Sequence, residues 1–280
     1  MNDLHFYKMQ AAGNDFVVIN AIEKEFSLEK LVEWTPKLCD RRFGIGGDGL
    51  LALSRSRMKK ADFEMIYRNA DGSDAGMCGN GARCLARFAK VIGGFASKQQ
   101  FHVKKNVYSA KIFDGGNVAV NFPFRPSVTP VTETYSSMAE QIYKTYPGTE
   151  HVVMLPVTGY YMEQEKELVD EGSRLRYHKL FKPAGTNVNF VLPLEDDRIS
   201  LQTYERGVED LTLACGTGAI ASALTWHHYQ QTEEAKNHYT VECKGGDLEV
   251  DFSYEPSESR YQNIVLKGKA EFVFEGIIRV

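Results

Sequence analysis

The stretches CGNGA, residues 78–82, and CGTGA, residues 215–219, share the pattern C-G-x-G-A, and this repeat decides how the chain is interpreted. A tyrosine lies eleven residues upstream of each copy, Tyr67 and Tyr204, and each copy runs into a helix-forming stretch. The copies are 137 residues apart in a chain of 280, close to half its length. This spacing predicts a duplicated half-molecule with one cysteine at the start of a helix in each half.

The bulk composition excludes several classes of protein. Hydrophobic residues make up 43% and charged residues 25%, as in ordinary globular enzymes, and the length favours two domains. A net charge of −4 argues against a nucleic-acid partner, which selects a basic surface. No apolar run reaches the length of a membrane span, and the N-terminus lacks a signal-peptide pattern, so we expect no membrane partner.

The cysteines indicate a reducing compartment and no metal. Their number is odd and their spacing fits no zinc pattern, so we expect reduced thiols, a cytoplasmic location and no metal site. Cys84 falls among apolar helix residues and is interpreted as core packing. The five positions are Cys39, Cys78, Cys84, Cys215 and Cys243.

The rest of the chain predicts a mixed fold. Strand patterns precede a helix at residues 80–92, and further strands surround a second helix at residues 217–228. Residues 123–130 hold three prolines and predict a linker. We expect an α+β fold of two pseudo-symmetric domains, each a curled, mostly antiparallel sheet around a central helix. The first covers residues 1–122 with a returning strand at 269–280, and the second covers 123–268.

The cysteine loops carry the candidate chemistry. A cysteine just before a helix lies beside N–H groups without intrahelical acceptors and at the positive end of the dipole, which lowers the pKa of a thiol. The same N–H groups bind carboxylates, and the glycines allow a ligand to approach. One such loop is more simply a buried cysteine beside a turn. Two matched loops favour a pair of thiols that removes a proton from one side of a carbon and returns it on the other.

Other polar residues have ordinary explanations when taken singly. Asn14 and Asn187 follow glycine turns, where asparagine is common. Glu205 and Arg206 suit a surface ion pair, and His151 alone is an unremarkable polar residue.

The segment GIGGDG, residues 44–49, matches the residue spacing of the dinucleotide-binding pattern G-x-G-x-x-G but not its secondary-structure context. That fingerprint follows a strand and precedes a helix, whereas here a helical pattern precedes and a strand pattern follows. We interpret these glycines as a tight connection and expect no nucleotide cofactor.

Taken together, the motifs resemble the diaminopimelate epimerase family. They occur in the family's order from residue 8 to about residue 220, and the two cysteine loops are highly specific. The matching stretches are KMQAAGNDF (8–16), RFGIGGDGL (42–50), NADGS (69–73), CGNGARC (78–84), GTN (185–187), YERG (204–207) and ACGTG (214–218).

The resemblance implies a cofactor-free epimerase that interconverts LL- and meso-2,6-diaminopimelate for lysine and peptidoglycan synthesis, and a homodimer. By motif, Cys78 and Cys215 match the catalytic thiols, and His151 and Glu205 match residues that tune them. The backbone cradles for the reacting carboxylate match Gly79, Asn80, Gly216 and Thr217. The remaining substrate-binding positions match Asn14, Asn69, Thr149, Asn187, Glu205 and Arg206.

Three stretches depart from the family pattern. Gln10-Ala11 stands in place of His-Gly, and residues 148–151 read GTEH in place of Gly-Asn-Pro-His. Thr149 therefore replaces a binding asparagine. Leu211 stands where an acidic residue is frequent, four positions before the second cysteine.

Three other readings stay open at this point. The nearest is another racemase of this superfamily, acting on proline, hydroxyproline or a different amino acid. A thiol redox protein is disfavoured because the chain has no C-x-x-C pair. A non-catalytic binding protein is disfavoured because both loop cysteines are present.

Overall fold

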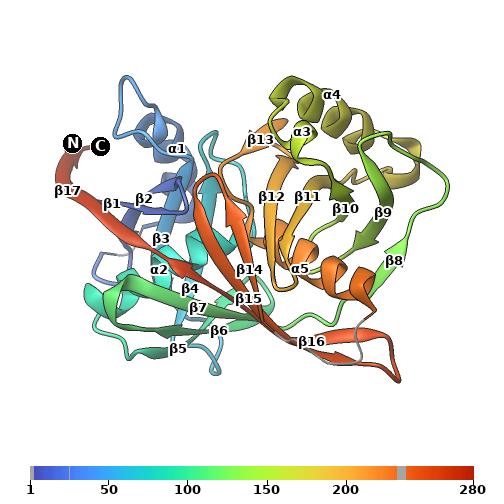
Figure 1. Cartoon of the computed structure of the whole chain (residues 1–280). Helices are drawn as coiled ribbons and strands as arrows, with labels where there is room; N and C mark the ends of the chain where they lie inside the picture. The colour runs from blue at the N-terminus through green and yellow to red at the C-terminus, as the bar shows by residue number, and fades with distance from the viewer. Residues whose placement is uncertain (1–2, 25, 232–237) are drawn as a thin grey trace. The chain divides into compact units, whose positions relative to one another are not determined.

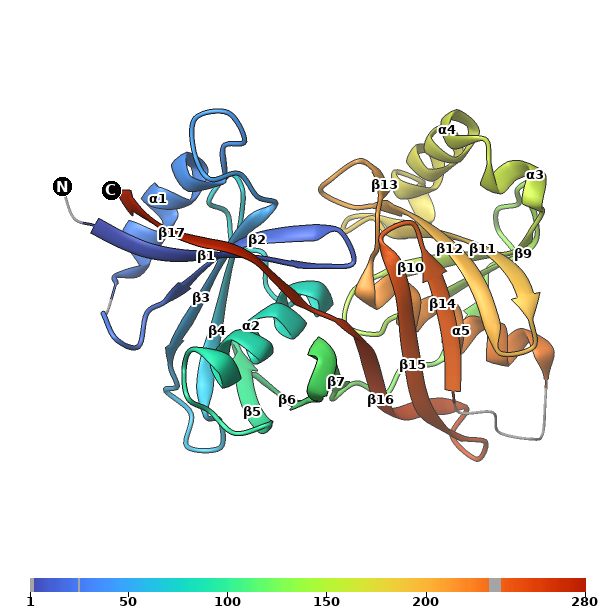
Figure 2. The same cartoon turned by 60° about the vertical axis from the view of Figure 1, so that its left-hand side comes forward.

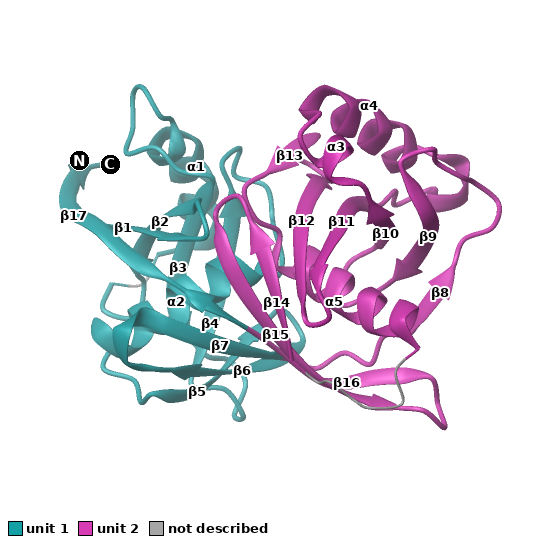
Figure 3. Ribbon diagram, viewed as in Figure 1, with its two compact units in different colours: residues 1–121, 267–280 teal, residues 122–266 magenta. Residues whose placement is uncertain are grey.

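The computed structural model describes residues 3–24, 26–231 and 238–280. Two compact units divide the chain, residues 1–121 with 267–280 and residues 122–266 (Figure 3). No helix in the described part of the chain is long and apolar enough to cross a membrane.

The first unit is built on one mixed sheet (Figure 1). The strands pair in the order β17-β1-β2-β3-β4-β5-β6-β7, with β2–β3 and β4–β5 parallel and the other pairs antiparallel. The elements are β1 (Asp3–Ala11), β2 (Asn14–Asn20), α1 (Leu28–Cys39), β3 (Gly49–Arg55), β4 (Phe63–Asn69), α2 (Gly79–Val91), β5 (Lys98–Val103), β6 (Asn106–Ile112), the 3-10 turn η1 (Asp114–Gly116), β7 (Asn117–Phe122) and β17 (Glu271–Arg279).

The second unit has the same kind of sheet. The order is β8-β9-β10-β11-β12-β14-β15, with β10–β11 and β12–β14 parallel, and β13 pairs with β12. The elements are β8 (Val128–Pro130), β9 (Ala139–Thr145), β10 (His151–Val157), α3 (Gly159–Met162), α4 (Glu165–Arg176), the 3-10 turn η2 (Lys179–Phe181), β11 (Asn187–Glu195), β12 (Arg198–Glu205), β13 (Asp210–Thr212), α5 (Gly216–Gln230), β14 (His238–Cys243), β15 (Gly246–Glu255) and β16 (Arg260–Lys269).

The two units repeat one pattern of strand pairing. In the first unit β1–β2 is antiparallel, β2–β3 is parallel and β3–β4 is antiparallel. After α2, β4–β5 is parallel and β5–β6 is antiparallel. In the second unit the pairs β9–β10, β10–β11 and β11–β12 repeat the first three directions. After α5, the pairs β12–β14 and β14–β15 repeat the last two. The duplicated α+β fold expected from the two cysteine loops is therefore confirmed.

Each sheet curls around its helix. α2 contacts β1, β2, β3, β4 and β6, and α5 contacts β8 through β12 as well as β14 and β15 (Figure 2). Most of α5 consists of small and apolar residues, and its first turns are buried on nearly every side. A helix of that composition is stable only when surrounded by other elements, which accounts for its central position.

The outer face of the second sheet carries α3 and α4. Val152 and Met154 of β10 pack with Leu168 and Leu175 of α4. Because successive side chains of a strand point to opposite faces, His151 points to the other face, toward α5. In the first unit α1 packs in the same way against alternate residues of β2 and β3. The alternation places polar strand residues beside the N-terminus of the central helix.

Two features differ from the expectations. The proline-rich segment 123–130, expected as a linker, ends in the strand β8, which pairs with β9. The helix α4 was not expected, because its sequence is mainly charged and buries only Leu168, Gly172 and Leu175.

Gly172 of α4 packs directly on Tyr204, the residue before Glu205 and Arg206. A Cβ at Gly172 would lie 2.6 Å from Cβ and Cγ of Tyr204, which is itself buried. We expect Gly172→Ala to lower the free energy of unfolding by about 1–3 kcal/mol, since overpacking displaces a buried ring. Urea unfolding measures this. Gly159→Ala is the matched control, because its added Cβ meets no atom within 4 Å. Equal stabilities of the two variants would contradict this packing.

Candidate active site

The first cysteine caps the helix α2. Cys78 has extended backbone angles, φ −127° and ψ 124°, and its Sγ accepts a hydrogen bond from the Gly81 N–H at 3.4 Å. The chain reaches this point from β4, which carries Tyr67. An N-cap residue combines an extended backbone with a side chain that accepts from the first turn, and here sulfur fills that role.

The second cysteine caps α5 in the same way. Cys215 has φ −111° and ψ 114°, and its Sγ accepts from the Gly218 N–H at 3.3 Å. Gly218 is required by packing, because a Cβ there would lie 2.5 Å from Asn189 Oδ1. The two predicted loops therefore have matching geometry, each with a sulfur atom at the positive end of a central helix.

Asn14 lies beside the first cysteine. The Cys78 Sγ is 3.7 Å from Asn14 Oδ1, and Asn14 Nδ2 donates to Asp48 Oδ2 at 2.6 Å. Asp48 pairs in turn with Arg41 at 2.7 Å. The sequence pattern of residues 44–49 assigns no role to Asp48, yet its carboxylate accepts a hydrogen bond from the Asn14 side chain that contacts the cysteine.

Asp48 belongs to a small network of charges. Arg41 forms two hydrogen bonds with Asp15, and the buried Lys8 pairs with Asp15 at 2.6 Å. Burial acts to raise the pKa of Asp15, but hydrogen bonds and charge from Arg41 and Lys8 hold it well below its ordinary range. These ionic contacts fix the positions of the Asp15 and Asp48 carboxylates, and Asp48 accepts the hydrogen bond from Asn14.

The other predicted residues of the first unit have separate partners. Asn80 is buried, and its Oδ1 accepts from Arg83 Nη2 at 2.8 Å. Asn69, at the end of β4, donates from Nδ2 to Ser73 Oγ at 3.0 Å. Gly79 is the first residue of α2, as the loop motif predicts.

A polar network leads away from Cys215. Its Sγ lies 3.7 Å from Thr217 Oγ1. His151 Nε2 is 2.9 Å from the hydroxyl oxygens of both Thr217 and Thr149, and the Thr149 hydroxyl contacts that of Thr217 at 3.4 Å. Four predicted residues of the second unit therefore share one network, and Gly216 starts the helix beside them.

The far side of His151 contacts Asn189, which was not predicted. Asn189 Nδ2 lies 3.0 Å from His151 Nδ1 and donates to Val152 O at 2.8 Å, while its Oδ1 accepts from Thr203 Oγ1 at 3.0 Å. Asn189 is fully buried. It lies two residues after Asn187 on β11, and the two-residue period of a strand is the sequence signal that places both on one face.

Burial controls the charge of His151. The side chain is almost wholly buried, and this burial, with a smaller effect of the Arg206 charge, lowers the pKa of His151 to about 3. The Asn189 hydrogen bond opposes the shift. His151 is therefore a neutral imidazole near neutral pH.

A second group lies at the starts of β10 and β11. Asn187 Nδ2 donates to the Glu150 carbonyl at 2.9 Å, and Asn187 Oδ1 accepts from the Arg206 backbone N–H at 2.9 Å. Arg206 Nη1 donates to Glu150 Oε2 at 2.8 Å and to Ala184 O at 3.2 Å. The family pattern has proline at the position of Glu150. The Glu150 carboxylate therefore offsets part of the positive charge of Arg206, the residue predicted to bind a carboxylate. Glu205 ends β12 and is half-buried beside this group.

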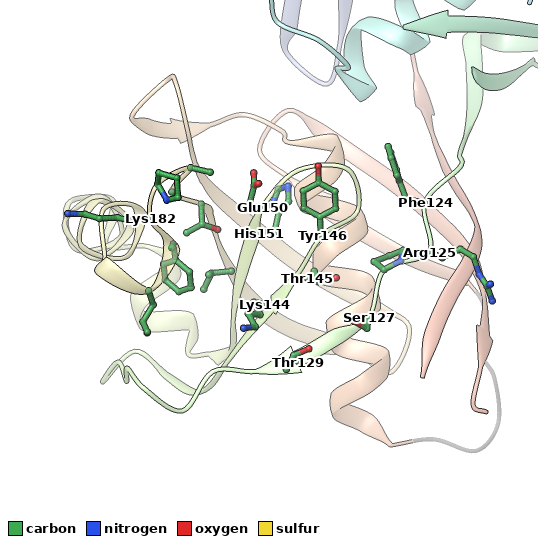
Figure 4. A pocket seen from close by; sticks show the side chains of 18 of the residues that line it. Phe124, Arg125, Ser127, Thr129, Lys144, Thr145, Tyr146, Glu150, His151 and Lys182 are labelled. Carbon is green, nitrogen blue, oxygen red and sulfur yellow. The ribbon is translucent and has the colours of Figure 1, made fainter. Parts of the chain in front are cut away.

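A cavity of about 620 Å³ lies next to these residues in the second unit. Figure 4 shows Glu150, His151, Tyr146 and Lys144 along its wall. The lining residues, all between 124 and 260, do not include Cys215 or Thr217. The cavity is thus a neighbour of the His151 network and does not contain the cysteine loop.

Comparisons with known proteins place these features in a family. A sequence model described as diaminopimelate epimerase matches residues 6–121 and 146–273. The chain is 37% identical over 275 residues to the diaminopimelate epimerase of Flavobacterium psychrophilum, covering 98% of this chain and 100% of that protein. It is 35% identical over 284 residues to the diaminopimelate epimerase of Aquifex aeolicus, covering 98% and 97%.

Solved structures share the fold at low sequence identity. A PhzF-family phenazine biosynthesis protein of Bacillus anthracis superposes with a TM-score of 0.75 at 13% identity, over 100% of both chains. A hydroxyproline epimerase from Agrobacterium vitis, with bound trans-4-hydroxy-L-proline, has a TM-score of 0.68 at 14% identity, over 99% of this chain and 92% of that one. At these identities the likeness establishes the fold alone.

The buried neutral His151 predicts a pH dependence of stability. Its folded pKa of about 3 lies below the unfolded value of about 6.5, so below about pH 6.5 the unfolded chain binds a proton that the folded chain excludes. The wild type should lose up to about 1.4 kcal/mol of stability per pH unit through this group as pH falls. His151→Gln should show a shallower decline between about pH 7 and about pH 5 in urea unfolding. Parallel curves for the two proteins would show that His151 titrates in the folded state.

Proposed function

Because this chain belongs to the diaminopimelate epimerase family, we propose that it interconverts LL- and meso-2,6-diaminopimelate without a cofactor. The single observation that carries the proposal is the pair of C-G-x-G-A loops, each with a cysteine sulfur capping a central helix through a backbone N–H. Matching geometry at the two sulfur atoms supports matching chemistry, with one thiol acting as base and the other as acid.

We propose that the helix starts also hold the carboxylate on the reacting carbon. The α-proton of an amino acid is a very weak acid, so the developing carbanion needs electrostatic stabilisation. The first N–H groups of α2 and α5 lie at the positive ends of the helix dipoles, where they would stabilise the negative charge on the carboxylate. Gly79, Asn80, Gly216 and Thr217 are the residues proposed for the two cradles.

The far end of the substrate carries a second amino acid group. We propose that Asn69, Asn187 and Arg206 bind its carboxylate and that Glu205 binds its ammonium, with Asn14 and Thr149 as further contacts. Arginine suits a carboxylate because its N–H groups form paired hydrogen bonds. Glu150 occupies Arg206 Nη1, so the carboxylate would bind the remaining guanidinium N–H groups or displace Glu150.

We also propose a homodimer in the cytoplasm, as the family resemblance implies. Support for an interface comes from β17, which exposes the large apolar side chains of Val273, Phe274 and Ile277. Diaminopimelate is the only small-molecule partner proposed.

Incubation with LL-diaminopimelate, followed by chiral chromatography, tests the proposed reaction. The meso form should accumulate to equilibrium, whereas L-proline and trans-4-hydroxy-L-proline should remain unchanged. Turnover of proline or hydroxyproline without turnover of diaminopimelate would assign the chain a different substrate.

The two cysteines should each be indispensable. Cys78→Ala and Cys215→Ala should each lower kcat at least about a thousandfold, because a proton must be both removed and returned. Cys243→Ala is the matched control and should keep wild-type turnover, since Cys243 lies at the end of β14 outside both loops. Retention of substantial turnover in either loop variant would exclude the two-thiol reaction.

A further inference from the structure

Three neighbouring strands bring Glu150, Asn187 and Arg206 to one edge of the second sheet. The parallel strands β10 and β11 both begin there, with His151 opposite Asn187, and the antiparallel strand β12 ends there. Glu150 directly precedes β10, Asn187 is the first residue of β11, and Arg206 directly follows β12. The sheet therefore gathers an acid, an amide and a base from three distant parts of the sequence.

Asn187 holds the main chains of the two charged residues together. Its backbone N–H donates to the Glu150 carbonyl at 3.0 Å, and its Nδ2 donates to the same oxygen at 2.9 Å. Its Oδ1 accepts from the backbone N–H of Arg206 at 2.9 Å. The two charged side chains therefore start from fixed positions, and their ion pair at 2.8 Å needs no further ordering of the backbone.

The ion pair uses only one side of the Arg206 guanidinium. Nη1 donates to Glu150 Oε2 at 2.8 Å and to the Ala184 carbonyl at 3.2 Å, which occupies both of its hydrogens. Among the described residues, Nε and Nη2 of Arg206 and Oε1 of Glu150 form no hydrogen bond. The Nε–Nη2 edge of a guanidinium can hold a carboxylate through two parallel hydrogen bonds. A ligand carboxylate can therefore bind Arg206 while Glu150 stays in place.

Both charged side chains are accessible to a ligand. The Arg206 side chain is 27% exposed and that of Glu150 is 43% exposed, and Glu150 also borders the cavity of the second unit (Figure 4). The pair offers a guanidinium edge beside a carboxylate oxygen. An amino acid group carries a carboxylate and an ammonium on one carbon, so it complements such a pair with both of its charges.

The opposite charges of the pair discriminate among ligands. A carboxylate without an ammonium is attracted by Arg206 but repelled by Glu150. An ammonium without a carboxylate is attracted by Glu150 but repelled by Arg206. A group that carries both charges gains from both residues, and each incomplete group is opposed by one of them.

We propose, building on the function proposed above, that Glu150 is a specificity-determining residue that makes the far end of the site selective for a zwitterion. Arg206 binds the far carboxylate through its Nε–Nη2 edge. Glu150 stays paired with Nη1 and accepts from the far ammonium through Oε1, in addition to Glu205. The ligand class is a molecule with an amino acid group at each end, and a proline at position 150 would lack this second carboxylate.

Three amino acids with the same reacting end test this selectivity. Diaminopimelate has a far carboxylate and a far ammonium, L-2-aminopimelate lacks the far ammonium, and L-lysine lacks the far carboxylate. Isothermal titration calorimetry of the reduced protein measures the dissociation constant of each. Diaminopimelate is added as an equilibrated mixture of the LL and meso forms, so that turnover does not change the ligand. The wild type should bind it at least about tenfold more tightly than either incomplete ligand.

Glu150→Gln keeps the shape of the side chain and removes its charge. L-2-aminopimelate should bind at least about threefold more tightly, because the attraction of Arg206 is no longer offset. L-lysine should bind at least about threefold more weakly, because the charge of Arg206 then acts alone. Glu150→Pro, which introduces the residue of the family pattern, should shift both ligands in the same directions as Glu150→Gln.

Glu171→Gln is the matched control. It removes a carboxylate that pairs with Arg174 on α4, and it should leave all three dissociation constants unchanged. Opposite shifts of the two incomplete ligands in Glu150→Gln support the proposal, because a general distortion of the site would weaken both. Shifts in the same direction, or dissociation constants equal to those of the wild type, overturn it.

Binding and turnover are separate measurements. Opposite shifts without conversion of LL-diaminopimelate would refute the proposed reaction and leave the role of Glu150 intact. Normal conversion without opposite shifts would refute the role of Glu150 and leave the proposed reaction intact.

Discussion

The structure depends on one local constraint, a cysteine that must cap a buried helix in each half of the chain. The sulfur accepts a backbone N–H of the first turn, so it lies where unsatisfied N–H groups and the helix dipole meet. In the second unit α5 is central because its residues are small or apolar on nearly every side, and the sheet curls around it to bury them. Burial of the helix and placement of the sulfur are therefore consequences of the same fold.

Strand alternation determines what surrounds each sulfur. On β10 the residues on one face pack against α4, which leaves His151 on the face of α5. The parallel pairing of β10 with β11 brings Asn189 to the same face, where it contacts His151. Identical strand order in the two units, combined with different residues at equivalent positions, produces two chemically unequal environments from one duplicated backbone.

Much of this arrangement follows from the sequence, because its signals are local. The cysteine loops, the central helices and the duplicated α+β fold depend on capping residues, glycines and apolar periodicity within short windows. The contact of Asp48 with Asn14 and that of Asn189 with His151 could not be predicted in this way, since they join residues 34 and 38 positions apart along the chain. The pairing of Glu150 with Arg206 likewise depends on where β10 and β12 lie in the sheet.

In the proposed reaction two thiols act on opposite sides of one carbon. Turnover of LL-diaminopimelate in heavy water, sampled well before equilibrium, tests it most directly. Deuterium should appear at the inverted carbon of the meso product while the recovered LL substrate remains unlabelled, because the product receives its proton from the second, solvent-exchanged thiol. Equal labelling of substrate and product from the earliest times would show that one base serves both faces.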